Sequence, residues 1–225
     1  SRAVFEDLLY QNVRQSGGSS SQSTLLPTGM TLGTGVRVVA TEKLHTQGSV
    51  QNTEQALDVA INGRGFLQIQ MPDGDTSYTR DGSLKLDDQG QLVTSSGYIV
   101  QPGISIPDGA QSITIGLDGI VSVKLAGQTS PTQVGTIEIA DFINPVGLQP
   151  MGENLFVETA SSGPATSGTP GLSGLGTLVQ GALEGSNVNV VAELVNMIET
   201  QRAYEMNSKA ISTNDQMMQY INQNL

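Results

Sequence analysis

Apolar and polar residues follow two different patterns along this chain, and each pattern predicts a different kind of element. Between about residues 55 and 158, short apolar runs are separated by dipeptides in which a polar residue precedes glycine. The runs are LDVAI (57–61), FLQIQ (66–70), SLKLD (83–87), QLVTS (91–95), SITIG (112–116), IVSVK (120–124) and TIEIADF (136–142). Pairs such as Asn62-Gly63 and Gln89-Gly90 supply the positive φ angles that tight hairpin turns require. This pattern predicts an all-β globular domain of short antiparallel strands.

The second pattern is an apolar side chain that returns every seven residues near the end of the chain, without an intervening proline or glycine. These seam positions are Val190, Met197, Tyr204, Ile211, Met218 and Leu225. Seven residues make two turns of an α-helix, so the six side chains form one seam along one face. A helix of about 36 residues spans about 54 Å, which is longer than a small core can cover. The seam therefore predicts a long C-terminal helix that packs against partner helices.

The columns beside the seam indicate what kind of packing to expect. The column that would complete a two-stranded coiled coil begins apolar and becomes polar: Leu194, Gln201, Ser208, Asp215, Asn222. A second apolar column flanks the seam instead: Ala203, Ala210, Met217. A wide stripe of small and partly polar residues favours packing among several helices over a strict dimer. Leu194 is included with the seam as a packing position.

The remaining segments are read as helix, arms and linkers. Residues 3–14, AVFEDLLYQNVR, have the spacing of a short amphipathic helix with Val4 and Leu8 facing inward. Residues 15–29 are rich in glycine and serine, which indicates either a disordered linker or an arm that orders only against neighbours. Residues 33–50 are expected to be extended, and Ser186 or Asn187 is expected to cap the final helix. The predicted organisation is 1–54 helix and arm, 55–159 β domain, 160–186 extended return and 187–225 helix.

Composition excludes several functions. The net charge is −11, and the 10 basic residues are scattered, which argues against nucleic-acid binding. Cysteine is absent, so disulfides and thiol chemistry are impossible. No apolar run approaches the roughly 18 residues that a membrane span needs, and no secretory leader pattern is found. The chain starts at Ser1 without an initiator methionine, from which we expect a fragment or a processed form.

Candidate catalytic and metal sites are weak. Asp73-Gly74-Asp75 and Asp87-Asp88 lack the spaced carboxylates of a calcium loop and are interpreted as turns. His45 is the only histidine, and no Gly-x-Ser-x-Gly elbow occurs. Gly63-Arg64-Gly65 lacks the third glycine of a dinucleotide loop, and Arg80 could pair locally with Asp81. We therefore predict no catalytic residue, no cofactor and no metal site.

Seven segments of the chain resemble the bacterial flagellar axial proteins of the rod and hook. They are AVFEDLLYQ (3–11), TGVRVVAT (34–41), DVAINGRGFLQI (58–69), YTRDGSLKLDDQGQLVTSSGY (78–98), ITIGLDGIVSV (113–123), GENLFVET (152–159) and EGSNVNVVAELVNMIETQRAYEMNSKAI (184–211). The FEDLLYQ start followed by the Gly/Ser arm favours a distal-rod member over proximal-rod and hook members. Members of this family open with a helix ending in a motif similar to ANNLANVNT-x-GF, which is missing from these 225 residues.

The resemblance implies a structural protein of the flagellar basal body that lacks catalysis and is exported by the flagellar type III system. Subunits would polymerise helically into a hollow drive shaft crossing the periplasm, next to other rod and hook proteins and inside the P- and L-rings, without membrane insertion. The terminal helices, including the family's opening helix, would form the inner tube, and the β domain the outer layer. The arm would stiffen the shaft through subunit contacts at Gly17, Gly18, Leu25, Leu26 and Pro27.

Three other functions remain open at this point. One is another axial protein of the same family, from the proximal rod or the hook. A second is an all-β hydrolase with an oligomerising tail, which turnover abolished by one Asp or Glu substitution would reveal. The third is an adhesin or secreted binding module whose helix forms a coiled-coil stalk, which a small defined oligomer would indicate.

Overall fold

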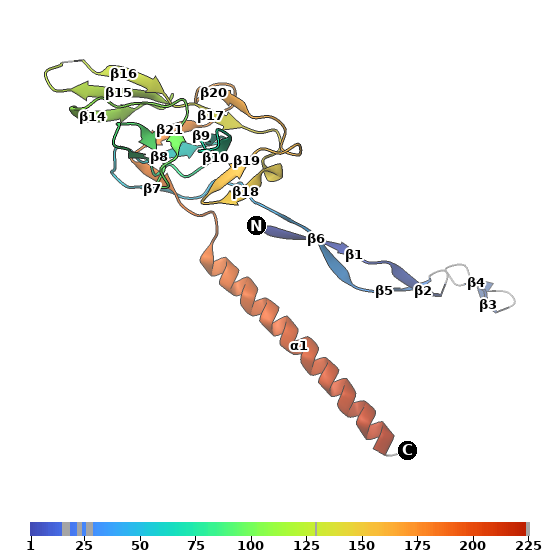
Figure 1. The fold of residues 1–225 in the computed structure, drawn as a ribbon. Coiled ribbons are helices and arrows are strands. Elements are labelled where there is room, and N and C mark those ends of the chain that lie inside the picture. Colours follow the sequence, from blue (N-terminus) through green and yellow to red (C-terminus); the bar gives the residue numbers. More distant parts are fainter. Residues whose placement is uncertain (15–18, 22–23, 26–28, 129, 224–225) are drawn as a thin grey trace.

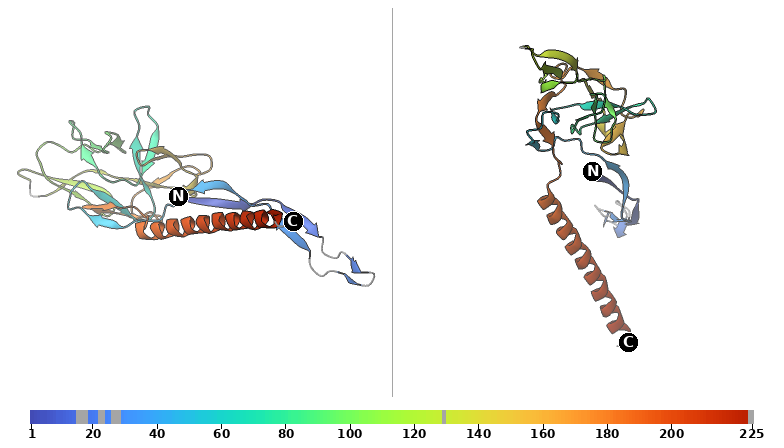
Figure 2. Two further views of the ribbon diagram at one scale, coloured as in Figure 1. Left: turned by 90° about the horizontal axis from the view of Figure 1, so that it is seen from below. Right: turned by 60° about the vertical axis from the view of Figure 1, so that its left-hand side comes forward.

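A computed structural model describes residues 1–223 of the chain, except 15–18, 22–23, 26–28 and 129. It has three parts, a β domain, a long two-stranded arm and a C-terminal helix (Figure 1). The arm and the helix leave the domain on the same side (Figure 2) and point in different directions in the view of Figure 1. The mainly antiparallel β fold with one C-terminal helix confirms the predicted fold class.

The arm is formed by the first six strands. These are β1 (Arg2–Asp7), β2 (Tyr10–Arg14), β3 (Ser19–Ser21), β4 (Thr24–Leu25), β5 (Met30–Gly33) and β6 (Val36–Glu42). The chain runs outward along β1 to β3 and returns along β4 to β6, with antiparallel pairs β1–β6, β2–β5 and β3–β4. Arg2 pairs with Glu42 beside the domain, so the N-terminus lies at the root of the arm (Figure 1).

The predicted helix over residues 3–14 is wrong, because this segment forms strands β1 and β2. A helix of about 12 residues is marginal in water by itself. Here β6 satisfies the backbone of β1, and its β-branched Val36 and Val38 suit a strand. The local periodicity of 3–14 is overridden by pairing with distant residues, such as Ala3 with Thr41.

The described residues of the domain form sixteen short strands in sequence order, β7 to β22, and one 3₁₀ turn. They are β7 (Val50–Asn52), β8 (Val59–Asn62), β9 (Phe66–Gln70), β10 (Thr76–Thr79), β11 (Lys85–Leu86), β12 (Leu92–Val93), β13 (Ile99–Val100), β14 (Ala110–Ile115), β15 (Ile120–Leu125), β16 (Thr132–Thr136), β17 (Ile139–Asp141), η1 (Pro145–Gly147), β18 (Gln149–Gly152), β19 (Leu155–Val157), β20 (Thr166–Gly168), β21 (Thr177–Gln180) and β22 (Ala182–Glu184). Most glycines of the predicted turn dipeptides have the expected positive φ angles, whereas Gly82 does not. Gly90 has φ 75°, and a Cβ there would collide with the carbonyl oxygen of Ile106.

A nine-stranded sheet dominates the domain, with the order β11-β12-β13-β9-β10-β19-β18 and with β17 joining β9 to β20. Strands β14, β15 and β16 form a second sheet, and β8 pairs with β21. Buried aliphatic side chains between these strands form the main core: Val59, Ile61, Leu67, Ile69, Leu92, Val100, Val121, Val123, Ile137, Ile139 and Leu178. Leu178 comes from the segment expected to be an extended return, so this segment contributes to the core.

The C-terminal helix α1 (Val190–Gln223) has 34 residues. The side chain of Asn189 caps it, since its Oδ1 accepts hydrogen bonds from the backbone N–H groups of Val191 (3.1 Å) and Ala192 (3.2 Å). The predicted caps, Ser186 and Asn187, were wrong. Asn187 instead donates its Nδ2 protons to the carbonyl oxygens of Leu44 (3.0 Å) and Thr46 (2.9 Å). It thereby ties the start of the helix to the root of the arm.

Candidate assembly interface

The seam of α1 is uncovered in the single chain. Each seam position that the structure describes is exposed: Val190, Leu194, Met197, Tyr204, Ile211 and Met218. Leu225 lies outside the described residues. None of the described residues of α1 is buried. The helix therefore gains no stability from packing on its own domain.

A second set of apolar side chains on α1 was missed by the seven-residue analysis. Val191, Val195 and Ile198 are exposed and lie three and four positions apart, so they share one face of the helix. At about 100° per residue, this face is turned roughly a quarter of a circle from Val190. A helix that is apolar on more than one side is normally buried among several partners. A search for residues that recur every seven positions does not detect this second stripe, because its members are three and four positions apart.

The arm also exposes apolar side chains, although most of its predicted contact residues are not among the described residues. Gly17, Gly18, Leu26 and Pro27 lie outside the described residues, and Leu25 is placed in the backbone of β4. Along the described part of the arm, exposed apolar side chains occur on both strands: Phe5, Leu9, Val13, Leu32, Val36 and Val38. A two-stranded ribbon without a covered face is marginal in water. The assignment of residues 3–14 to a helix concealed that Phe5, Leu9 and Val13 lie exposed along the arm.

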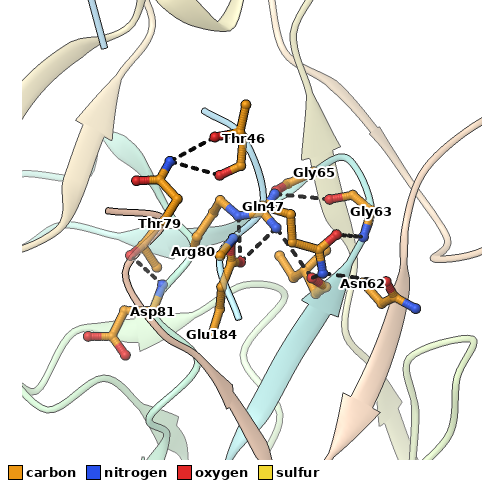
Figure 3. A network of polar contacts seen from close by, with 12 residues as sticks. Thr46, Gln47, Asn62, Gly63, Gly65, Thr79, Arg80, Asp81 and Glu184 are labelled. Carbon is orange, nitrogen blue, oxygen red and sulfur yellow. Dashed lines mark hydrogen bonds and ion pairs between the residues drawn. The ribbon is translucent and has the colours of Figure 1, made fainter. Parts of the chain in front are cut away.

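One ion pair fixes the point from which the arm and the helix leave the domain. Arg80, after β10, pairs with Glu184 in β22, with Nη2 2.7 Å and Nε 2.8 Å from Oε2 (Figure 3). Only 18% of the Arg80 side chain and 10% of the Glu184 side chain are exposed. The predicted local pair of Arg80 with Asp81 is not what forms. Asp81 instead accepts hydrogen bonds from Ser83.

The same arginine and glutamate bind backbone from two other segments. Arg80 donates to the carbonyl oxygens of Gly63 (3.1 Å), Gly65 (3.0 Å) and Ile61 (3.3 Å). The other oxygen of Glu184 accepts the N–H of Gly48 at 2.8 Å. Gln47, the neighbour of Gly48, accepts the N–H of Gly63 at 3.0 Å (Figure 3). The root of the arm and the strand before α1 are thus both attached to the same turn after β8.

Asp87 and Arg64, which were considered for other chemistry, have structural partners. Asp87 Oδ1 accepts the N–H groups of Gln89 and Gln91, as a turn residue does. Arg64 pairs with Asp141 across 3.0 Å. Among the described residues, no group of three His, Asp or Glu side chains is arranged to hold a metal ion. Within the same residues, no helix has the length and apolar character of a membrane span.

Known proteins match both the domain and the helix. Residues 60–123 match the D1 domain of the flagellar hook proteins FlgE/F/G, and residues 179–224 match the C-terminal region of the flagellar basal body rod proteins FlgEFG. The flagellar basal-body rod protein FlgG of Buchnera aphidicola subsp. Acyrthosiphon pisum is 56% identical over 99% of this chain and 86% of its own length. FlgG of Caulobacter vibrioides is 50% identical over 99% of this chain and 85% of its own length.

A rod protein of another name is less similar. The flagellar basal-body rod protein FlgF of Escherichia coli K12 is 35% identical over 76% of this chain and 68% of its own length. A β domain with a long uncovered helix and these matches define a flagellar axial protein, the class of structural proteins of rod and hook. Within that class, the chain belongs to the family of the flagellar basal-body rod protein FlgG, the structural protein of the distal rod.

Proposed function

We propose that this chain polymerises with copies of itself into a hollow helical shaft that transmits torque to the hook. The observation that carries the proposal is the exposure of all described residues of α1, on a helix too long for its own domain to cover. The seam and the second stripe of α1 would pack against helices of neighbouring subunits and form the inner tube. The β domain would form the outer layer, and the subunit performs no catalysis.

The shape of the chain supports an open array over a closed ring. The arm and the helix reach away from the domain on the same side (Figure 2), and we expect each of them to meet a neighbouring subunit through unlike surfaces. Such head-to-tail contacts produce helical filaments when the rotation between subunits does not close. By family membership, the subunits would be exported by the type III system. The assembled shaft would adjoin other rod and hook proteins and run inside the P- and L-rings.

Cysteine crosslinking tests the proposal directly, because the native chain contains no cysteine. We would place two cysteines on the seam, at Met218 and Val190, and as the control two cysteines in exposed turns of the domain, at Asp73 and Asp108. Treatment of rods in cells with a thiol crosslinker should give a ladder of multimers from the Met218→Cys and Val190→Cys double variant. A single dimer band from that variant, or an equal ladder from the Asp73→Cys and Asp108→Cys double variant, would contradict the inner-tube assignment.

The helix should depend on its partners for stability. Val190, Val191 and Val195 are weak helix formers, and Ser208 and Thr213 weaken the middle of α1. In dilute solution we expect residues 187–225 to fray, while the sheets of the domain stay folded. Helicity measured by circular dichroism should rise with protein concentration and with added peptide of the family's opening helix. Full helicity independent of concentration would show that the chain stabilises its helix alone.

We propose that the arm segment 15–29 stiffens the shaft by bridging subunits. Arg14 and Met30 are register partners in the β2–β5 pair, so an Asn-Gly turn can replace 15–29 without breaking that hairpin. This replacement should leave the domain folded and give a more bendable, hook-like polymer, which electron microscopy of rods would show. Hydrogen exchange supplies a second measurement. If amides of 15–29 exchange equally fast in monomer and polymer, the bridging role is wrong.

A further inference from the structure

A cavity of about 470 Å³ lies where the root of the arm, the domain and the segment before α1 meet. Its wall includes residues 44–46 from the arm root, residues 80–82 after β10 and residues 183–187 from β22 to the start of the helix. Three parts of the chain that must keep a fixed orientation in a rigid polymer thus surround an open space. Any change in how the arm root sits here changes the angle at which the arm leaves.

The imidazole of His45, the only histidine in the chain, holds the arm root against an aromatic cluster. Its ring packs edge to face with Phe66 (centroids 5.7 Å apart) and Phe156 (5.3 Å). Phe66 in turn packs on Phe142, so three of the four phenylalanines of the chain join this cluster. In the described structure, Nε2 of His45 is buried and has no hydrogen-bond partner. A neutral imidazole tolerates this site far better than a cation would.

The charges around His45 also oppose its protonation. Burial lowers the pKa of the imidazole below its ordinary value of 6.5, and the cations of Arg80 and Lys43 lower this pKa further. The carboxylates near it already have partners. Glu184 binds Arg80 and the N–H of Gly48, and Asp81 binds Ser83 and Asn154.

Two other carboxylates flank this site and are occupied as well. Glu42, at the end of β6, is paired with Arg2. Glu158, after β19, accepts the N–H of Ala165 and interacts with Tyr78. A proton on His45 would therefore find no free anion in its present position. The imidazolium would gain partners only by swinging into the cavity toward water and toward Glu184, where it competes with Arg80.

We propose that His45 is a pH-sensitive latch, which holds the arm root (residues 43–48) on the domain while the imidazole is neutral and releases it on protonation. Because the pKa of the docked His45 imidazole lies below 6.5, the stability that docking gains from the neutral ring is fully present above pH 6.5. Its stability falls as the pH drops from 6.5 toward the docked pKa. Once the arm root is released, the angle at which the arm leaves the domain is no longer fixed. The latch acts within one chain, so its test does not require polymerisation.

Nuclear magnetic resonance on the whole chain tests the latch, since one histidine gives one imidazole signal. We expect a pKa below 6.5 for His45. Protonation should weaken the docking equilibrium about tenfold for each unit by which the pKa of His45 lies below 6.5. This equilibrium is read from the hydrogen-exchange protection of the Gly48 amide, which donates to Glu184. A measured His45 pKa at or above 6.5 would overturn the proposal.

The variant His45→Phe keeps an aromatic ring on Phe66 and Phe156 but cannot titrate. Its Gly48 protection, corrected for intrinsic exchange, should stay constant between pH 8 and pH 5. The variant His45→Gln removes the ring contacts and should lower protection at every pH. If His45→Phe loses protection over the same pH range as the native chain, another group is responsible and the latch is wrong.

Discussion

The substitution Ile211→Asp should abolish polymerisation and motility while leaving the single chain as stable as before. Ile211 is 64% exposed in the lone chain, so a charge there stays hydrated and the free energy of unfolding should change by less than about 0.5 kcal/mol. In the assembled inner tube the same aspartate would be buried without a partner, at a cost of several kcal/mol. A loss of about 3 kcal/mol per contact raises the critical concentration more than about a hundredfold.

The matched control is Ile211→Leu, which keeps the apolar seam and should assemble normally. Rods in isolated basal bodies, seen by electron microscopy, and swimming in soft agar measure assembly. Urea unfolding followed by circular dichroism measures the stability of the lone chain. Normal rods from Ile211→Asp would place Ile211 outside the packed seam. A clear fall in the stability of the monomer would mean instead that Ile211 packs within its own chain.

The helix and the main strands were predictable because their patterns are local. A seven-residue repeat without proline or glycine leaves little alternative to a helix, and α1 begins at the first seam residue, Val190. The run FLQIQ lies between turn residues and coincides with β9, which is buried at four of its five positions. In each case, neighbours in the sequence are enough to set the backbone conformation of the element.

The arm was not predictable in the same way, because its conformation depends on distant pairing. Residues 3–14 satisfy an amphipathic helix locally, yet the backbone of β1 is hydrogen-bonded to β6. Tertiary pairing routinely overrides a weak local propensity. The cap of α1 failed for a related reason. Asn187 has the right chemistry for a cap, but its amide is engaged by the arm root at Leu44 and Thr46.

The contacts at the junction of the arm, the domain and α1 could not be predicted from the sequence. Arg80 and Glu184 are 104 positions apart, and the segments that contain them give no indication that they pair. Arg80 stands beside Asp81, which made a local pair the simpler hypothesis. What decides the partner is the pairing of β22 with β7, which brings Glu184 opposite Val50 and so to the base of the arm. Only the folded topology supplies that information.

Loss of this pair should have the largest effect on the stability of the lone chain. The variant Arg80→Met preserves much of the side-chain volume but leaves Glu184 without its cation, and leaves the carbonyl oxygens of Gly63 and Gly65 without their donor. Since both charged side chains are mostly buried, we expect a loss of about 3–5 kcal/mol in the free energy of unfolding. Urea unfolding followed by far-ultraviolet circular dichroism is the suitable measurement, because the chain has no tryptophan.

Arg64→Met is the matched control for this prediction. Arg64 also pairs with a carboxylate, that of Asp141, at 3.0 Å, but 65% of its side chain is exposed. Exposed pairs contribute about 0–1 kcal/mol, so this variant should remain close to the native chain. A third variant, Arg80→Lys, keeps the charge but loses the planar fork that reaches carboxylate and carbonyls together, and should fall between the two. Equal losses in the free energy of unfolding from Arg80→Met and Arg64→Met would show that burial of the ion pair at the junction adds nothing to stability. A small loss from Arg80→Met would show that the root of the arm and the start of α1 are held by their backbone pairing alone.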